Sequence, residues 1–283
     1  MARRSDQLYL REFTMPAVLF TKQDGIARIT LNRPEVRNAM DPEMIVQLAE
    51  AWKDFDTDPD MRVALVTGSG DAAFCAGADL GKLIPLVTGA RKPETDYDRR
   101  VLADQNLVDA ALMKTLTPVY KPVVAAVNGF CLAGGTELVE ATDIRIAAEH
   151  ARFGLTEVAR GLVPAGGSLA RLARQVPFAK AMEILLTGNH MTAAEAWRIG
   201  MVNEVLPADE VLPRAEEFAA MIAANGPLAV RACKEAVIRT SGLTLAEAFE
   251  IEAELTARVM ASDDAREGPL AFMEKRPPRF TGS

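Results

Sequence analysis

Short apolar runs alternate with longer amphipathic stretches through the first two thirds of the chain. The runs at 63–67 and 122–127 have the length and the β-branched content of strands that are buried on both faces. Shorter strand signals lie at 18–21, 26–31 and 143–147. Asp41-Pro42 is a good helix start, and it is followed by an apolar stripe at helical spacing, made of Met44, Leu48, Ala51, Trp52 and Phe55. This alternation predicts a parallel α/β sheet.

The pattern changes after Phe178, where strand signals nearly vanish apart from a short one at 201–205. Helical periodicity predicts helices at 178–187, 192–199, 208–224, 227–240 and 244–261. Gly268-Pro269 carries the last turn signals. Earlier in the chain, residues 81–97 are mixed and highly charged. We expect a mobile loop there, over the site, that continues into a helix through about Thr115.

At two places a strand leads through small residues into a helix. One strand is followed by Asn128-Gly129, then by Gly134-Gly135 and a helix that contains Glu137. The other leads through small residues to Ala78 and to Asp79, a candidate N-cap. The first N–H groups of a helix have no partner within it, so each place offers a donor to a bound anion. Glu137 lies three residues after Gly134, so a donor and a carboxylate are expected to share one pocket.

Composition and charge narrow the class of protein. The chain has 283 residues, 49% of them hydrophobic, which is ample for a core. A formal net charge of −7 argues against nucleic acid or an anionic membrane as the main partner. No apolar run approaches the roughly 18 residues of a membrane span. The basic start Met1-Ala2-Arg3-Arg4 has no apolar signal region after it, so we expect residues 1–15 to be a flexible tail on a cytoplasmic protein.

Cysteine and histidine usage excludes several chemistries. The three cysteines, Cys75, Cys131 and Cys233, have no metal-ligand spacing and are expected to be reduced thiols. The only two histidines, His150 and His190, lie far apart, and we assign both a structural or surface role. This removes most metal sites and most Ser-His-acid triads. Phosphate-loop, dinucleotide-binding and nucleophile-elbow motifs do not occur either.

Two carboxylates are the remaining candidates for chemistry. Glu137 and Glu157 each follow a glycine-containing turn beside apolar sequence. Such glutamates act as acids or bases in some proteins and are solvated helix residues in others, and the residues alone leave both readings open.

A series of motifs occurs in order over nearly the whole chain. The motifs are Leu31-Asn32-Arg33-Pro34 with Asn38-Ala39, Ala73-Phe74-Cys75-Ala76-Gly77-Ala78-Asp79-Leu80, Ala126-Val127-Asn128-Gly129 with Gly134-Gly135-Thr136-Glu137-Leu138, Asp143-Ile144-Arg145, Phe153-Gly154-Leu155-Thr156-Glu157 and Phe272-Met273-Glu274-Lys275-Arg276. It is their combination that is specific, and it resembles the enoyl-CoA hydratase/isomerase (crotonase) family.

The resemblance implies a fold and a domain organisation. We expect an α/β protein with a crotonase-like ββα spiral core at 16–205, which holds the coenzyme A thioester site. A helical C-terminal region at 206–283 is expected to mediate trimerisation, and the whole protein to be a homotrimer or a hexamer.

The resemblance also implies a site. The N–H groups of Ala78 and Gly134 are expected to form an oxyanion hole for the thioester oxygen, with Glu137 and Glu157 as the catalytic carboxylates. No metal and no separate cofactor are implied, because coenzyme A is part of the substrate. The residues expected to bind the substrate or coenzyme A are Arg37, Ala39, Ala76, Asp79, Leu80, Phe130, Thr156, Gly161 and, reaching a neighbouring subunit's site, Phe272 and Lys275.

The pair of glutamates indicates the reaction. Family hydratases use both carboxylates to add water across the 2,3 double bond of an enoyl-CoA, whereas family isomerases, dehalogenases and decarboxylases commonly lack one. Hydration, as in fatty-acid β-oxidation, is therefore our leading interpretation. An isomerase, a specialised acyl-CoA dehydratase and a non-catalytic CoA-thioester-binding protein remain as alternatives.

Three residues depart from the family pattern. Thr156 stands where many relatives have proline, Arg160 where an apolar residue is common, and Ala165 where glycine is frequent. Our hypothesis is that Arg160, close after Glu157, favours a polar or charged acyl group; a surface or subunit-interface arginine is the alternative.

Overall fold

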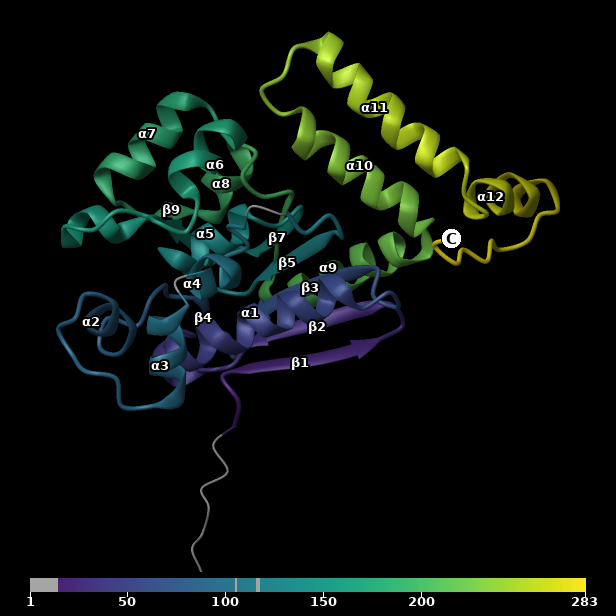
Figure 1. Cartoon of the computed structure of the whole chain (residues 1–283). Coiled ribbons are helices and arrows are strands. Elements are labelled where there is room, and N and C mark those ends of the chain that lie inside the picture. The colour runs from purple at the N-terminus through teal and green to yellow at the C-terminus, as the bar shows by residue number, and fades with distance from the viewer. Residues whose placement is uncertain (1–14, 105, 116–117) are drawn as a thin grey trace, which may run out of the picture.

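A six-stranded sheet runs through the molecule in the order β1-β2-β3-β5-β7-β10 (Figure 1). β1 and β2 are antiparallel, and the other neighbouring pairs are parallel, as the sequence predicts. Every residue of β3 and β5 is buried. The strands are β1 (Val18–Gln23), β2 (Ile26–Leu31), β3 (Val63–Gly68), β5 (Val123–Val127), β7 (Ile144–Ala148) and β10 (Glu204–Leu206).

The computed structural model describes residues 15–104, 106–115 and 118–283. The tail expected at 1–15, with Met1-Ala2-Arg3-Arg4, therefore lies almost entirely outside the described residues. Within them, no helix combines the length and the apolar character that a membrane span needs.

A second, smaller sheet has the order β4-β6-β8-β9. Its strands are β4 (Ala73–Cys75), β6 (Phe130–Leu132), β8 (Arg152–Gly154) and β9 (Met191–Thr192). β6 and β8 were not predicted, because strands of three residues are too short to show a period. Gly129 makes the turn from β5 into β6 possible, since a Cβ atom there would lie 2.3 Å from the Ala72 carbonyl oxygen.

The two sheets are joined by a repeated unit of two strands and a helix. β3 and β4 lead to α2 (Leu83–Val87), β5 and β6 to α5 (Gly134–Glu140), and β7 and β8 to α6 (Ser168–Gln175). In each unit the first strand belongs to the large sheet and the second to the small one. This is the ββα spiral expected from the resemblance.

The segment at 81–97 differs from the expected mobile loop. It contains α2, and α3 (Asp96–Ala103) and α4 (Asn106–Ala111) follow in place of one continuous helix. The buried Asp98 carboxylate accepts two hydrogen bonds from Arg91, at 2.7 and 2.8 Å, and another from the Glu94 N–H. This ion pair ties the segment down. The helix expected to start at Asp79 begins later, at Leu83, with Lys82 in the N-cap position. Asp79 still accepts from the N–H groups of Gly81 and Lys82, as a capping side chain does, but in the turn before α2.

The remaining helices largely match the periodicity. They are α1 (Pro42–Thr57), α7 (Phe178–Thr187), α8 (Ala193–Arg198), α9 (Ala208–Ala224), α10 (Pro227–Thr240), α11 (Leu245–Met260) and α12 (Asp264–Met273), with 3-10 helices η1 (Pro34–Val36) and η2 (Thr156–Arg160). Two expectations need correction. The strand expected at 201–205 begins at Glu204, and the turn expected at Gly268-Pro269 lies inside α12.

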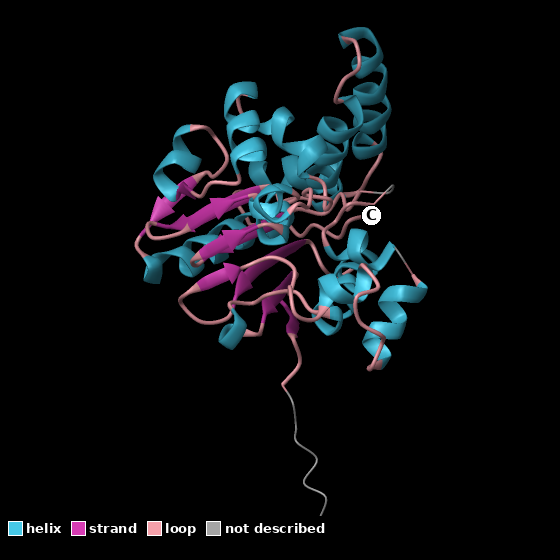
Figure 2. Ribbon diagram, turned by 90° about the vertical axis from the view of Figure 1, so that its left-hand side faces the viewer, coloured by secondary structure: helices cyan, strands magenta, loops and turns pink. Residues whose placement is uncertain are grey.

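The C-terminal helices differ in how they attach to the core. α9 packs against β3, β5 and β7. α10 and α11 pack against each other and stand out from the body of the molecule, with α12 beyond them (Figures 1 and 2). The boundary between core and oligomerisation region that we placed at 205/206 stays a prediction.

Candidate active site

A cavity of about 700 Å³ lies where the ββα units meet. Most of its lining is apolar, and α2, η2 and the first turn of α5 all contribute to it. The residues of the sequence analysis that line it are Arg37, Ala76, Ala78, Leu80, Gly134, Glu137, Thr156 and Glu157, together with the divergent Arg160 and Ala165. The structure thus brings both predicted carboxylates and both predicted oxyanion donors to one cavity.

Ala78 and Gly134 lie next to each other across the cavity wall. A Cβ atom built on Gly134 would be 3.9 Å from the Ala78 nitrogen. Gly77 allows this approach, because it has a φ of +94° and a Cβ atom there would lie 2.6 Å from the Ala133 Cβ.

The two N–H groups are available as donors for different reasons. Met40 donates to the Gly77 carbonyl and accepts from the Asp79 N–H, so the N–H of Ala78, between them, points the other way. Gly134 is the first residue of α5, where an N–H has no acceptor within the helix. This geometry suits an oxygen that develops negative charge.

Glu137 is held in place one turn into α5. Its side chain is 4% exposed, and its Oε1 accepts the Gly166 N–H at 2.6 Å and the Ser168 N–H at 3.4 Å. Burial, and then the charge of Glu157, raise its pKa to about 7, against the opposing effect of the two N–H donors and Arg171. A carboxyl group with such a pKa exchanges protons readily near neutral pH.

Glu157 approaches the cavity from η2. It is half-buried, and its Oε2 has no hydrogen-bond partner among the described residues. Burial raises its pKa, while its own backbone N–H and the Arg160 charge act in the opposite direction. The Glu157 charge thus acts on Glu137, and the two carboxyls differ in hydrogen bonding. Glu137 is fixed by two N–H groups, whereas one Glu157 oxygen is left for another partner.

Arg37 stands at the cavity with a φ of 56°. Its guanidinium lies over the ring of Phe130, 5.4 Å from the ring centre, and Phe130 meets the His190 ring edge-to-face at 6.4 Å. Phe130 thus supports Arg37 without lining the cavity itself. His190 is exposed and does line it, which the sequence analysis did not anticipate.

Other predicted residues lie outside the cavity lining. The Arg33 guanidinium donates to the Ala39 carbonyl and, at 3.1 Å, to Asp79, so the Asp79 side chain is engaged by Arg33. Gly161 follows η2 as its left-handed C-cap. Phe272 lies at the end of α12 and Lys275 in the turn after it, far from α2 in the same chain, and Phe272 is 82% exposed. Their role at a neighbouring subunit's site stays a prediction.

Sequence reasoning missed most of the apolar wall. The residues concerned are Met40, Ile45, Leu83, Ile84, Val87, Leu112, Leu132, Leu162 and Val163. The apolar spacing of Leu83, Leu86 and Val87 is a weak helical signal that charged neighbours obscured. Gly166 was noted only as part of a turn, since no local pattern reveals its bond to Glu137, 29 residues earlier.

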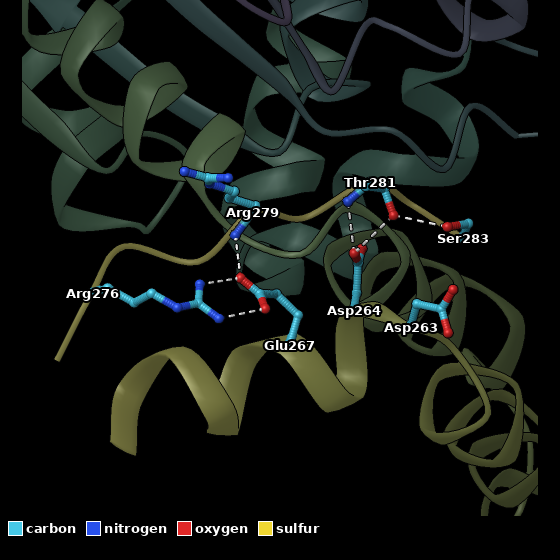
Figure 3. Close-up of a pocket in the computed structure, with 7 residues that line it drawn as sticks. All are labelled: Asp263, Asp264, Glu267, Arg276, Arg279, Thr281 and Ser283. Atoms are coloured by element: carbon cyan, nitrogen blue, oxygen red, sulfur yellow. Dashed lines mark hydrogen bonds and ion pairs between the residues drawn. The ribbon is translucent and has the colours of Figure 1, made fainter. Parts of the chain in front are cut away.

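A second hollow, of about 570 Å³, lies between α12 and the C-terminal tail (Figure 3). Its charges satisfy one another: Glu267 pairs with Arg276 and accepts the Arg279 N–H, and Asp264 accepts the N–H groups of Thr281 and Gly282. These contacts fasten the tail to α12. Nowhere in the described residues do three or more His, Cys, Asp or Glu side chains gather as metal ligands would.

Comparison with known proteins places the chain in a family. Residues 21–283 match the family model described as enoyl-CoA hydratase/isomerase. The chain is 42% identical over 266 residues to the enoyl-CoA hydratase EchA19 of Mycobacterium tuberculosis, covering 94% of this chain and 96% of that protein. It is 36% identical to the (E)-benzylidenesuccinyl-CoA hydratase of Thauera aromatica, over 95% and 100% of the two chains.

A solved structure agrees with this placement. The crystal structure of an enoyl-CoA hydratase from Mycobacterium tuberculosis superimposes with a TM-score of 0.83 at 38% identity, covering 95% of this chain and 100% of that one. The ββα spiral and the motifs around the cavity point to the same assignment. The protein therefore belongs to the enoyl-CoA hydratase/isomerase family and has its crotonase fold.

Proposed function

We propose that this protein is an enoyl-CoA hydratase, which adds water reversibly across the 2,3 double bond of an enoyl-CoA thioester. The observation that carries the proposal is the pair Glu137 and Glu157, two carboxyls with raised pKa values that line one cavity. The relatives named as hydratases support it, since they match over nearly the full chain.

The oxyanion hole consists of the N–H groups of Ala78 and Gly134. Attack of water on Cβ moves charge onto the thioester oxygen, and the two donors stabilise the resulting enolate. Each such donor lowers the barrier by about 3 kcal/mol. Because both belong to the backbone at a turn, they are in place before the substrate arrives.

The two carboxylates divide the proton transfers. Glu137, whose Oε1 is fixed by Gly166 and Ser168, orients the water and accepts its proton as the oxygen bonds to Cβ. Glu157, with its raised pKa, supplies the proton that Cα receives. A positioned carboxylate typically accelerates such a transfer by about 10²–10⁴-fold. In dehydration the same groups exchange roles.

The coenzyme A portion lies toward Arg37. The exposed guanidinium is braced by Phe130 and is suited to a phosphate oxygen. Ala76 and Leu80 continue this side of the cavity, and the Leu80 side chain is 55% exposed. The acyl part then occupies the apolar region around α2.

The assembly is a homotrimer or a dimer of trimers. Large apolar side chains stand exposed on α10, α11 and α12: Val237 at 73%, Leu245 at 74%, Phe249 at 60%, Phe272 at 82% and Met273 at 78%. Exposed apolar groups in this number favour an interface between subunits. Size-exclusion chromatography with light scattering tests the assembly, and a stable monomer would contradict it.

The location is cytoplasmic and the role is in fatty-acid β-oxidation. Cys75 and Cys131 are partners across β4 and β6 and are free thiols, which suits a reducing compartment. Growth of a deletion strain on fatty acids, with fractionation of the cell, tests both points.

The direct test of the reaction is incubation of the purified protein with crotonyl-CoA. Hydration removes the conjugated double bond, so the ultraviolet absorbance of the thioester falls, and mass spectrometry shows a product heavier by one water. A product of unchanged mass with a shifted double bond would favour an isomerase instead. Binding without turnover of crotonyl-CoA and longer enoyl-CoA thioesters would favour a non-catalytic protein.

A further inference from the structure

Three cationic side chains, Arg37, Lys114 and Arg160, line the cavity. Lys114 is neutralised by Asp109, 3.2 Å away, and it also donates to the Ala165 carbonyl. Arg37 rests on the Phe130 ring on the coenzyme A side. Arg160 has a single hydrogen bond, to the Thr156 carbonyl at 2.9 Å, and no carboxylate of the described residues lies within ion-pair distance of it. Arg160 is therefore a cation of the cavity that forms no ion pair with the described residues.

The backbone places Arg160 beside the reacting groups. η2 is a 3-10 helix, in which side chains three residues apart lie directly above one another. Glu157 and Arg160 have this spacing, and both line the cavity. Burial is the larger influence on the Glu157 pKa, but the Arg160 charge also reaches it and lowers it. The guanidinium thus stands near the catalytic carboxylate and on the same side of the cavity.

The surroundings decide what this guanidinium can bind. The neighbouring wall, with Leu162 and Val163, is apolar, and a carboxylate without a partner is costly in such a place. Arg160 itself is exposed, so an anion bound to it keeps part of its hydration. A guanidinium also pairs with a carboxylate through two parallel hydrogen bonds, a geometry that water or an apolar group does not use.

We propose that the acyl group of the natural substrate carries a carboxylate at the end away from the thioester, and that this carboxylate pairs with Arg160. The inference rests on the proposed function, because it assumes that the acyl group of a CoA thioester enters this cavity. Arg160 then has a second effect: it offsets the repulsion between the substrate carboxylate and Glu157, so that an anionic acyl chain does not disturb the catalytic pair.

The test compares enoyl-CoA thioesters that differ only at the far end. A series of four to eight carbons is used, each length with a terminal methyl group or a terminal carboxylate, and kcat/KM is measured for hydration. Arg160→Leu removes the cation, and Arg160→Lys keeps the charge but not the paired donors. Arg174→Leu is the matched control, because Arg174 is also exposed and also donates to the carbonyl four residues earlier, yet it does not line the cavity.

The expected result is a loss of preference for the carboxylated series. At the best-matched length, Arg160→Leu lowers the ratio of kcat/KM for the carboxylated thioester to kcat/KM for the methyl thioester by about 10-fold or more, and any effect through Glu157 is common to both substrates and cancels in this ratio. Arg160→Lys retains part of the preference, Arg174→Leu retains all of it, and added salt weakens it in the wild type. The inference would be overturned if the ratio of kcat/KM for the carboxylated thioester to kcat/KM for the methyl thioester were the same in wild type and in Arg160→Leu at every length. The proposed hydration reaction would still stand.

Saturated thioesters separate this inference from the proposed function. If no enoyl-CoA is hydrated, binding of adipyl-CoA and hexanoyl-CoA is compared by calorimetry. Tighter binding of adipyl-CoA that Arg160→Leu abolishes would support the carboxylate contact even though hydration had failed. Equal binding of the two in both proteins would overturn it.

Discussion

Gly166 donates its backbone N–H to Glu137 Oε1 over 2.6 Å. The Glu137 carboxylate on α5, the proposed catalytic base, is thus oriented by the turn that precedes α6, in the next ββα unit. A Cβ atom on Gly166 would lie 2.3 Å from Leu112 Cδ1 and 2.8 Å from Glu137 Oε2. Any other residue there would have to displace the ends of the Leu112 and Glu137 side chains, and glycine lets the chain pass close to the carboxylate without moving it.

Gly166→Ala should lower kcat for hydration by about 10-fold or more, because the new Cβ displaces the Glu137 carboxylate from its position and weakens the bond to its nearest donor. Initial rates with crotonyl-CoA, together with a thermal unfolding curve, measure the effect. Gly226→Ala is the control, since the nearest atoms to its new Cβ are 3.7 Å away in the Phe280 ring. Unchanged kcat in Gly166→Ala would show that this contact does not position the base.

The fall of the hydration rate on the acid side of the pH–rate profile should reflect protonation of Glu137. Burial and the Glu157 charge raise its pKa from 4.5 to about 7, and the carboxylate must be ionised to accept a proton from water. The rate should therefore fall as the pH decreases through about 7. The check is kcat/KM for crotonyl-CoA between pH 5 and pH 9. If kcat/KM fell only near pH 4.5, the proposed environment of Glu137 would be contradicted.

Glu140, one turn after Glu137, should make stability depend on pH. It is 1% exposed, and no protein donor among the described residues forms a hydrogen bond with its carboxyl oxygens. Burial raises its pKa to about 7, although the nearby Ser168 hydroxyl, which is not bonded to it, and the charges of Arg145 and Arg171 oppose this. The native state then binds the Glu140 proton more tightly than the unfolded state does, because the pKa of Glu140 is near 4.5 in the unfolded chain.

Protonated Glu140 stabilises the native state fully below pH 4.5, and this stabilisation is lost as the pH rises through about 7. The total loss in the free energy of unfolding is about 3 kcal/mol. Glu140→Gln, which stays neutral, should flatten this dependence and be more stable than wild type at pH 8. Urea unfolding at pH 5 and pH 8 measures it, with the exposed Glu183→Gln as control. Marked destabilisation of Glu140→Gln at pH 8 would instead mean that an ionised Glu140 compensates Arg145.

The ion pair between Asp98 and Arg91 should keep the segment between α2 and α3 ordered. Asp98→Asn weakens the bidentate pair with Arg91, and we expect a loss of about 1–3 kcal/mol in the free energy of unfolding. We also expect faster proteolysis between residues 83 and 96 and a higher KM, because α2 lines the cavity. Asp96→Asn, whose partner Arg99 is exposed, is the control. Equal proteolysis of both variants would argue against this role.

Much of the site could be predicted because its parts are local. Val123–Val127 is an unbroken apolar run, the glycines after it announce a turn, and Glu137 follows Gly134 by one helical turn. Asp41 likewise caps α1 through its bond to the Met44 N–H. In these places a few neighbouring residues determine the backbone conformation, so the local sequence pattern is enough to predict it.

The rest depends on contacts between distant residues. β6 has only three residues and exists because β4 and β8 lie beside it. α2 is fixed by neighbours such as Arg91 and Asp98, whose charges made the segment look like a loop. Pro269 signals a turn in isolation, yet α12 continues through it, with Asp264 and Glu267 holding the tail alongside.

The two-carboxylate mechanism is tested most directly by measuring kcat for hydration of crotonyl-CoA by wild type, Glu137→Gln, Glu157→Gln and the double variant. Glu183→Gln is the control. Each single variant should lose at least about 100-fold in kcat, and the double variant little more than either, because the two carboxyls act together in one addition of water. The control should keep wild-type activity. Substantial hydration by either single variant, in folded protein that still binds the thioester, would contradict the two-carboxylate mechanism.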